Sequence, residues 1–161
     1  MEKMSLRGRN EKRARTKSFI LIGDGFDEFE VVYLIHKFRQ AGLPIKSVSL
    51  FNKLVYSRQG VGIKADCALA EHPFDNVAED CLLILPTGGQ NGETLRQDAR
   101  VRPLLQLVKE RHGRVAVTDG QSSLARDLCQ IFTASSTVMH PVEEQMEFFV
   151  AALTDHALFA S

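Results

Sequence analysis

The chain has 161 residues, the size of one ordinary domain, and its contents of 44% hydrophobic and 25% charged residues are those of a soluble globular protein. The formal net charge is zero, but residues 1–17 hold seven Lys or Arg against two Glu, so the remainder carries five surplus negative charges. No stretch approaches the roughly 20 apolar residues of a membrane span, and the three cysteines and five histidines show no CxxC, HxH or HExxH spacing. Composition therefore argues against a membrane protein, a disulfide framework, a metal site and a bound cofactor.

The first 17 residues are predicted to form a basic disordered tail. An arm that contacts nucleic acid or anionic lipid is the alternative, but no aromatic residue accompanies its positive charges, so nucleic-acid binding is the weaker hypothesis. The apolar run at residues 18–22 is too short for a secretory signal. Scattered cysteines, odd in number, favour a reducing, cytoplasmic location.

The first half of the domain alternates between strand and helix patterns. Residues 18–22 (SFILI) read as a buried parallel strand. A helix is expected from about Asp27 to Ala41, closed by Gly42, and a second strand at residues 45–50. Shorter β pieces follow between residues 54 and 69.

The second half repeats the alternation. A buried strand at residues 82–85 is followed by one long amphipathic helix at about 94–111, and a strand at 114–118 by a helix to about 128. A last helix is expected to start at Pro141. The order predicts a single α/β domain over residues 18–161, with a doubly wound, flavodoxin-like, mostly parallel sheet and helices on both faces.

Three loops should meet at the carboxyl ends of these strands, where doubly wound sheets bind their ligands. They are GDGFDEFE (23–30), PTGGQNG (86–92) and TDGQS (118–122). If the protein has a reactive site, these loops should form it.

Glu30 and Gly88 are candidates in the first two loops. Glu30 stands three residues after Asp27, the position that completes a capping box, although it can instead point across the crevice. Gly88 follows a strand directly, where it serves either as a plain turn or as a backbone N–H donor to an oxyanion.

Asp119 lies in the third loop, at the strand-to-helix junction of residues 118–120, which we call the elbow. Aspartate there is a favoured helix cap, and a carboxylate is also a covalent nucleophile toward carbon or phosphorus centres. Such a nucleophile needs a base, for which His140 is a candidate, although it is equally plausible as a loop histidine. Gly120 would supply a second oxyanion donor.

Three segments together resemble the ThiJ/PfpI superfamily (the DJ-one family), which has a class I glutamine amidotransferase-like fold. The first is GDGFDEFEVVYLIHKFRQAGLPIKSVSL and the second LLILPTGGQNGETLRQDARVRPLLQLVKERHGRVAV; the third is the Met-His-Pro stretch at residues 139–141. Each motif is weak alone, and their order and spacing make the resemblance specific over residues 18–132.

The resemblance assigns roles to the candidate residues. Glu30 matches the family glutamate that hydrogen-bonds the nucleophilic cysteine, Gly88 and Gly120 match the oxyanion donors, and His140 matches a histidine found near the cysteine. Asp119 falls where that cysteine is expected. Family peptidase, glyoxalase-like and deglycase-like activities and redox sensing depend on the thiolate, so they are predicted to be absent.

A second departure from the family follows residue 128. Members usually place a further strand or hairpin before the last helix, and here only about ten residues, 131–140, fill that interval. The C-terminal region is therefore predicted to be shortened. The leading hypothesis is a pseudoenzyme that serves as a binding or regulatory module and forms a homodimer or higher homo-oligomer, with an unidentified small-molecule ligand. The alternative is a hydrolase with Asp119 as nucleophile and His140 as base.

Overall fold

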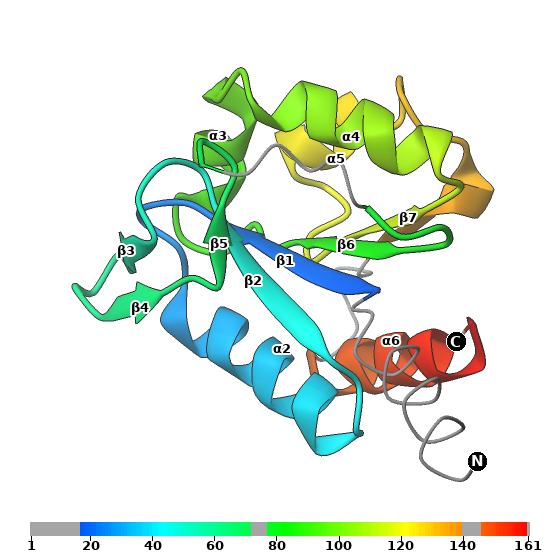
Figure 1. The fold of residues 1–161 in the computed structure, drawn as a ribbon, viewed down its shortest axis with the longest axis horizontal. Helices are drawn as coiled ribbons and strands as arrows, with labels where there is room; N and C mark the ends of the chain where they lie inside the picture. The colour runs from blue at the N-terminus through cyan, green and yellow to red at the C-terminus, as the bar shows by residue number, and fades with distance from the viewer. Residues whose placement is uncertain (1–16, 72–76, 140–145, 161) are drawn as a thin grey trace, which may run out of the picture.

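The computed structural model describes residues 17–71, 77–139 and 146–160. A central six-stranded sheet has helices on both faces (Figure 1). Helices α2 (Glu28–Gln40) and α6 (Met146–Ala160) cover one face, and α3 (Asn91–Gln97), α4 (Val101–Glu110) and α5 (Ser123–Leu128) cover the other. The predicted doubly wound α/β fold is confirmed. None of the helices in these ranges is long and apolar enough to cross a membrane.

All neighbouring strands of the sheet are parallel, in the order β5-β2-β1-β6-β7-β8. The strands are β1 (Ser18–Ile22), β2 (Ile45–Ser49), β5 (Cys67–Ala68), β6 (Leu82–Leu85), β7 (Arg114–Val117) and β8 (Thr137–Met139). A separate antiparallel hairpin consists of β3 (Leu54–Tyr56) and β4 (Gly62–Lys64). The strands predicted at 18–22, 45–50, 82–85 and 114–118 agree with β1, β2, β6 and β7 to within one residue.

Alternating side chains of the central strands fill two cores. In β1, Phe19 and Leu21 pack under α3, α4 and α5, whereas Ile20 and Ile22 pack against α2 and α6. All four are buried. This double burial explains why the strand is a continuous apolar run rather than an alternation of polar and apolar residues.

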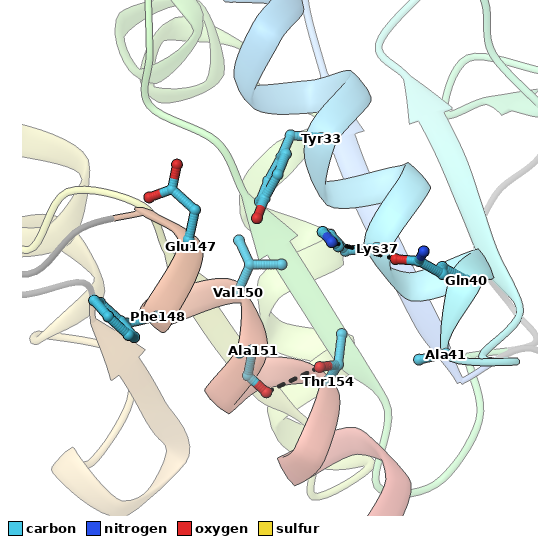
Figure 2. Close-up of a pocket in the computed structure, with 9 residues that line it drawn as sticks. All are labelled: Tyr33, Lys37, Gln40, Ala41, Glu147, Phe148, Val150, Ala151 and Thr154. Carbon is cyan, nitrogen blue, oxygen red and sulfur yellow. Dashed lines mark hydrogen bonds between the residues drawn. The ribbon is translucent and has the colours of Figure 1, made fainter.

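Helices α2 and α6 lie side by side on their face of the sheet, and a groove of about 560 Å³ lies between them (Figure 2). Tyr33 and Lys37 of α2 line one wall, and Phe148 and Val150 of α6 line the other. The groove is therefore a surface feature of the helical layer, away from the elbow.

The long helix predicted at residues 94–111 is wrong, because the segment forms two helices with a break at Asp98. The Asp98 backbone is extended (φ −88°, ψ 122°), and its carboxylate accepts hydrogen bonds from the backbone N–H of Arg100 at 2.9 Å and from the Arg100 guanidinium at 2.8 Å. Pro103 explains the break. Inside a continuous helix it would remove a hydrogen bond and clash with the preceding turn, but in the first turn of α4 it does neither.

A short strand, β8, follows α5 and a 3₁₀ turn (Ala134–Ser136) and pairs with β7 at the edge of the sheet. The sequence analysis expected no strand in this interval. Three residues give too few positions for an alternation pattern to be recognised.

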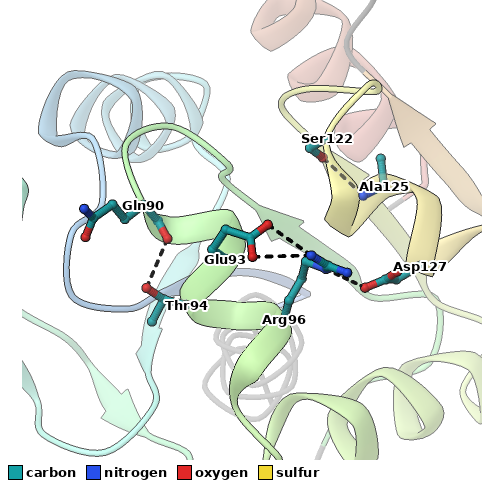
Figure 3. Close-up of polar contacts among 7 residues, drawn as sticks. All are labelled: Gln90, Glu93, Thr94, Arg96, Ser122, Ala125 and Asp127. Carbon is teal, nitrogen blue, oxygen red and sulfur yellow. Dashed lines mark hydrogen bonds and ion pairs between the residues drawn. The ribbon is translucent and has the colours of Figure 1, made fainter.

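Helices α3 and α5 are joined by an ion-pair network on the surface (Figure 3). The Arg96 guanidinium contacts Asp127 of α5 at 2.7 Å and Glu93 of its own helix at 3.1 Å. These side chains are at least one-third exposed, so the network contributes little to stability, but it links the helices that follow β6 and β7.

The Asp98 break generates a stability prediction. Asp98→Ala should lower the free energy of unfolding by about 1 kcal/mol, because it removes the carboxylate that accepts hydrogen bonds from Arg100, the residue that precedes α4. Urea denaturation measures this change, with Gln97→Ala, an exposed residue at the end of α3, as the control. Equal stability of the two variants would contradict this role for Asp98.

Candidate functional site

Glu30 and Thr118 meet at the carboxyl ends of the sheet. Thr118 directly follows β7, Glu30 lies in the first turn of α2, and the Thr118 hydroxyl donates a hydrogen bond of 2.5 Å to the Glu30 carboxylate. Both side chains are buried, with 4% of Thr118 and 7% of Glu30 exposed. This pair is the centre of the elbow site.

The turn after β6 makes two further contacts with the Thr118 hydroxyl. The backbone N–H of Thr87 donates to Thr118 Oγ1 at 2.8 Å, and the two threonine hydroxyl oxygens are 3.0 Å apart. Since the only hydroxyl hydrogen of Thr118 goes to Glu30, the Thr87 hydroxyl is the donor in the second contact. Thr87 thus contacts Thr118 Oγ1 through both its backbone N–H and its hydroxyl.

Gly88, the next residue of this turn, lies directly against the Glu30 carboxylate. A Cβ atom at position 88 would collide with Glu30 Oε2 and would stand 2.8 Å from Asp27 Cβ. Glycine is required here by the close approach of the carboxylate. Gly88 is the predicted site residue that the structure brings to Glu30, and its backbone hydrogen-bonds that carboxylate.

Burial raises the pKa of Glu30 above its ordinary value, and the nearby Asp27 carboxylate raises it further. Hydrogen bonds from the Thr118 side chain and from the Gly88 and Thr87 backbone lower the pKa, but they do not outweigh the loss of solvent. The carboxylate that acts on Glu30 is therefore Asp27, its neighbour at the start of α2.

Asp119 is exposed, and its carboxylate accepts a hydrogen bond of 2.9 Å from the backbone N–H of Gln121. The cap of α5 is Ser122, whose hydroxyl accepts from the N–H of Ala125 at 3.1 Å (Figure 3). The same hydroxyl donates to the Asp119 carbonyl at 2.7 Å. Asp119 therefore forms the turn that precedes the helix and does not cap the helix itself. Gly120 lies half-buried in the same turn, and its oxyanion role stays a prediction.

The predicted capping box at α2 forms only in part. Asp27 is the N-cap, and its carboxylate accepts from the backbone N–H of Phe29 at 3.0 Å and of Glu30 at 3.4 Å. The second Asp27 oxygen pairs with Arg58 at 3.2 Å. Glu30 does not return to the cap but reaches across to Thr118, which is the second of the two orientations that the sequence left open.

The three cysteines lie away from the elbow. Cys67 is in the edge strand β5, buried Cys81 precedes β6 at the opposite end of the sheet, and exposed Cys129 ends α5. Burial raises the pKa of Cys67, and it raises that of Cys81 to about 11, so both are thiols at neutral pH. Neither supplies the thiolate that cysteine chemistry requires.

Two further predictions concern ligands of the site. Within the described ranges, no group of three His, Cys, Asp or Glu side chains is arranged to hold a metal ion. His140, the candidate base, lies outside the described residues, so its role stays a prediction.

The sequence analysis missed Thr118. Thr118 could have been recognised as a polar residue between the apolar end of β7 and the Asp-Gly turn. The functional role was instead assigned to its acidic neighbour, Asp119. Spacing along one segment does not reveal which of two adjacent side chains faces Glu30.

The sequence matches the family model described as the DJ-1/PfpI family over residues 16–155. The chain therefore belongs to the DJ-1/PfpI family. No curated protein matches the sequence.

Solved structures share the fold at low sequence identity. A cysteine-to-alanine mutant of a DJ-1 superfamily protein from Salmonella typhimurium is 16% identical, with a TM-score of 0.72 over 90% of this chain and 91% of that chain. Schizosaccharomyces pombe DJ-1 is 19% identical (TM-score 0.68; 88% and 91% covered), and Drosophila melanogaster DJ-1beta is 15% identical (TM-score 0.71; 88% and 90% covered).

The raised pKa of Glu30 predicts how stability depends on pH. The folded protein binds the Glu30 proton more tightly than the unfolded chain does, so this contribution is fully present below the unfolded pKa of about 4.3 and is lost as pH rises through the folded pKa. Relative to Glu30→Gln, the wild type should lose free energy of unfolding above that pH. Urea denaturation at several pH values tests this, and parallel curves for the two proteins would contradict it.

Thr118→Val should extend the loss to higher pH, because the hydroxyl that lowers the pKa of Glu30 is gone. At pH 7 the variant should be less stable by about 1–3 kcal/mol, the cost of leaving a buried group without its donor. Thr118→Ser keeps the hydroxyl and is the matched control.

Proposed function

We propose that the protein is a non-catalytic member of its family that serves as a binding or regulatory module. The observation that carries the proposal is that the group hydrogen-bonded to Glu30 is the hydroxyl of a buried threonine, Thr118. The backbone N–H of Thr87 also donates to this hydroxyl, and the Thr87 hydroxyl oxygen lies 3.0 Å from it. The hydroxyl is thus held by polar groups of the protein itself.

The chemistry of the side chain supports the same proposal. In the family, the group that hydrogen-bonds this glutamate is a cysteine whose thiolate is the nucleophile. An aliphatic hydroxyl does not ionise at neutral pH, and activating it requires a base that removes its proton. Glu30 accepts the hydrogen bond, yet Thr118 as a whole is only 4% exposed, so a substrate has little access to its hydroxyl. We therefore interpret Thr118 and Glu30 as a structural contact at the position of the family's reactive site, and we call this contact the Thr118–Glu30 lock.

The alternative is a hydrolase that uses Asp119 as nucleophile, with His140 as base and the backbone N–H groups of Gly88 and Gly120 as oxyanion donors. Exposure of the Asp119 carboxylate favours it, because a substrate has access to that group. Engagement of Gly88 with Glu30 weighs against it, because the same glycine has to serve the oxyanion.

Turnover assays separate these functions. Consumption of an α-oxoaldehyde such as methylglyoxal, or of an ester, should be no faster with the wild type than with Thr118→Val. Activity that Thr118→Ser keeps and Thr118→Val loses would make the hydroxyl a nucleophile and overturn the proposal. An ester adduct on Asp119 in mass spectrometry, absent from Asp119→Asn, would establish the alternative.

We also propose that the protein forms a homo-oligomer through the face of α2 and α6. Phe29 and Phe148 are 68% and 63% exposed there, and Phe29 stacks on Tyr33 with ring centroids 6.0 Å apart. Monomeric soluble proteins rarely leave large aromatic side chains together on one face. The groove between the helices adds a concave surface for a second copy (Figure 2).

Light scattering coupled to size-exclusion chromatography tests the oligomer. The wild type should elute with at least twice the chain mass, and Phe148→Asp should shift the population toward the monomer. Phe51→Asp, which changes an exposed phenylalanine that follows β2, is the control. A wild type that stays monomeric at every concentration would refute this proposal and leave the non-catalytic role untouched.

A further inference from the structure

Asn91, the first residue of α3, is completely buried and makes three hydrogen bonds with its side chain. Its amide nitrogen donates to the carbonyl oxygens of Pro86 at 2.6 Å and Leu21 at 3.3 Å. Its amide oxygen accepts from the backbone N–H of Gly23 at 2.7 Å. A polar side chain at 0% exposure is stable only because all these groups are paired.

These partners lie at the ends of β1 and β6, the two adjacent strands at which the strand order of the sheet reverses. The connection from β1 passes through α2 on one face, and the connection from β6 passes through α3 and α4 on the other. In doubly wound folds this switch point is the usual ligand crevice. The strands β1 and β6 are paired up to Ile20 and Ile84. Beyond that point, the Asn91 carboxamide bridges the two strand ends.

The first turn of α3 closes the rest of this crevice. The backbone N–H of Gln90 donates to the Gly25 carbonyl at 2.8 Å, and the Thr94 hydroxyl donates to the Asp24 carbonyl at 3.2 Å. Gly23 lies so near Thr94 that a Cβ atom there would stand 2.6 Å from its methyl group. The chain itself occupies the place where related folds bind ligands.

The hydrogen-bond partners of Asn91 are close in sequence to residues of the elbow site, in both the loop after β1 and the loop after β6. Pro86 is followed by Thr87, which donates to Thr118, and by Gly88, which lies against Glu30. On the other side, Gly23 begins the loop that carries Glu30. We propose that Asn91 is the positioning residue of the elbow site, because it fixes the separation of the two loops whose side chains and amides meet at Thr118. The inference rests on the Thr118–Glu30 lock of the proposed function, but it does not depend on the absence of catalysis.

Amide hydrogen exchange by NMR tests the proposal in two Asn91 variants. Asn91→Leu removes all three bonds at similar size, and Asn91→Asp keeps an acceptor for Gly23 but loses the donors to Pro86 and Leu21. Val108→Ala, on the buried face of α4, is the control that lowers stability without touching these loops. Exchange is compared after correction for each variant's free energy of unfolding.

In Asn91→Leu, the amides of Gly23, Thr87 and Gly88 should exchange at least tenfold faster than global unfolding explains. In Asn91→Asp, Thr87 and Gly88 should lose protection while Gly23 keeps it, and Val108→Ala should show no excess at any of the three. Unchanged protection of Thr87 and Gly88 in the folded variants would overturn the proposal. If Asn91→Leu does not fold, the contrast within Asn91→Asp decides the same question. An active enzyme with this exchange pattern would refute the proposed function and leave the positioning role standing.

Discussion

The hydrogen bond between Thr118 and Glu30 is the constraint on which the elbow site depends. It joins the end of β7 to the first turn of α2, and both partners are buried, so neither has water as a substitute. Other features follow from it. Asp27 has to cap α2 without help from Glu30, and residue 88 has to be glycine because the carboxylate occupies the space of a side chain.

Under the proposed function, the same hydrogen bond belongs to a structural site. A thiol next to a glutamate can lose its proton and attack. A threonine hydroxyl does not ionise at neutral pH, and this one also contacts the backbone N–H and the hydroxyl of Thr87 in the turn after β6. Burial raises the pKa of Glu30 in this arrangement, and the hydrogen bonds of the site lower it only in part.

The strands and the family were predictable from the sequence because they depend on local patterns: continuous apolar runs, an acidic loop and a glycine turn. The break at Asp98 could have been predicted from Pro103, which does not fit inside a continuous helix. The strand β8 has too few residues to show an alternation pattern. The sequence singled out Asp119 at the elbow, and in the structure the residue that bonds Glu30 is its neighbour Thr118. Asp119 and Thr118 are adjacent in sequence, and which of them bonds Glu30 depends on the position of β7 in the packed sheet, where Val117 pairs with Leu85 and Thr118 follows directly.

The most direct measurement of the central claim is a ¹³C NMR titration of the Glu30 side-chain carboxyl in the folded protein. The Thr118–Glu30 lock predicts an apparent pKa above that of an ordinary glutamate, a further rise in Thr118→Val, and no comparable change in Asp119→Asn. An ordinary glutamate pKa, or a pKa that responds to Asp119→Asn and not to Thr118→Val, would contradict it.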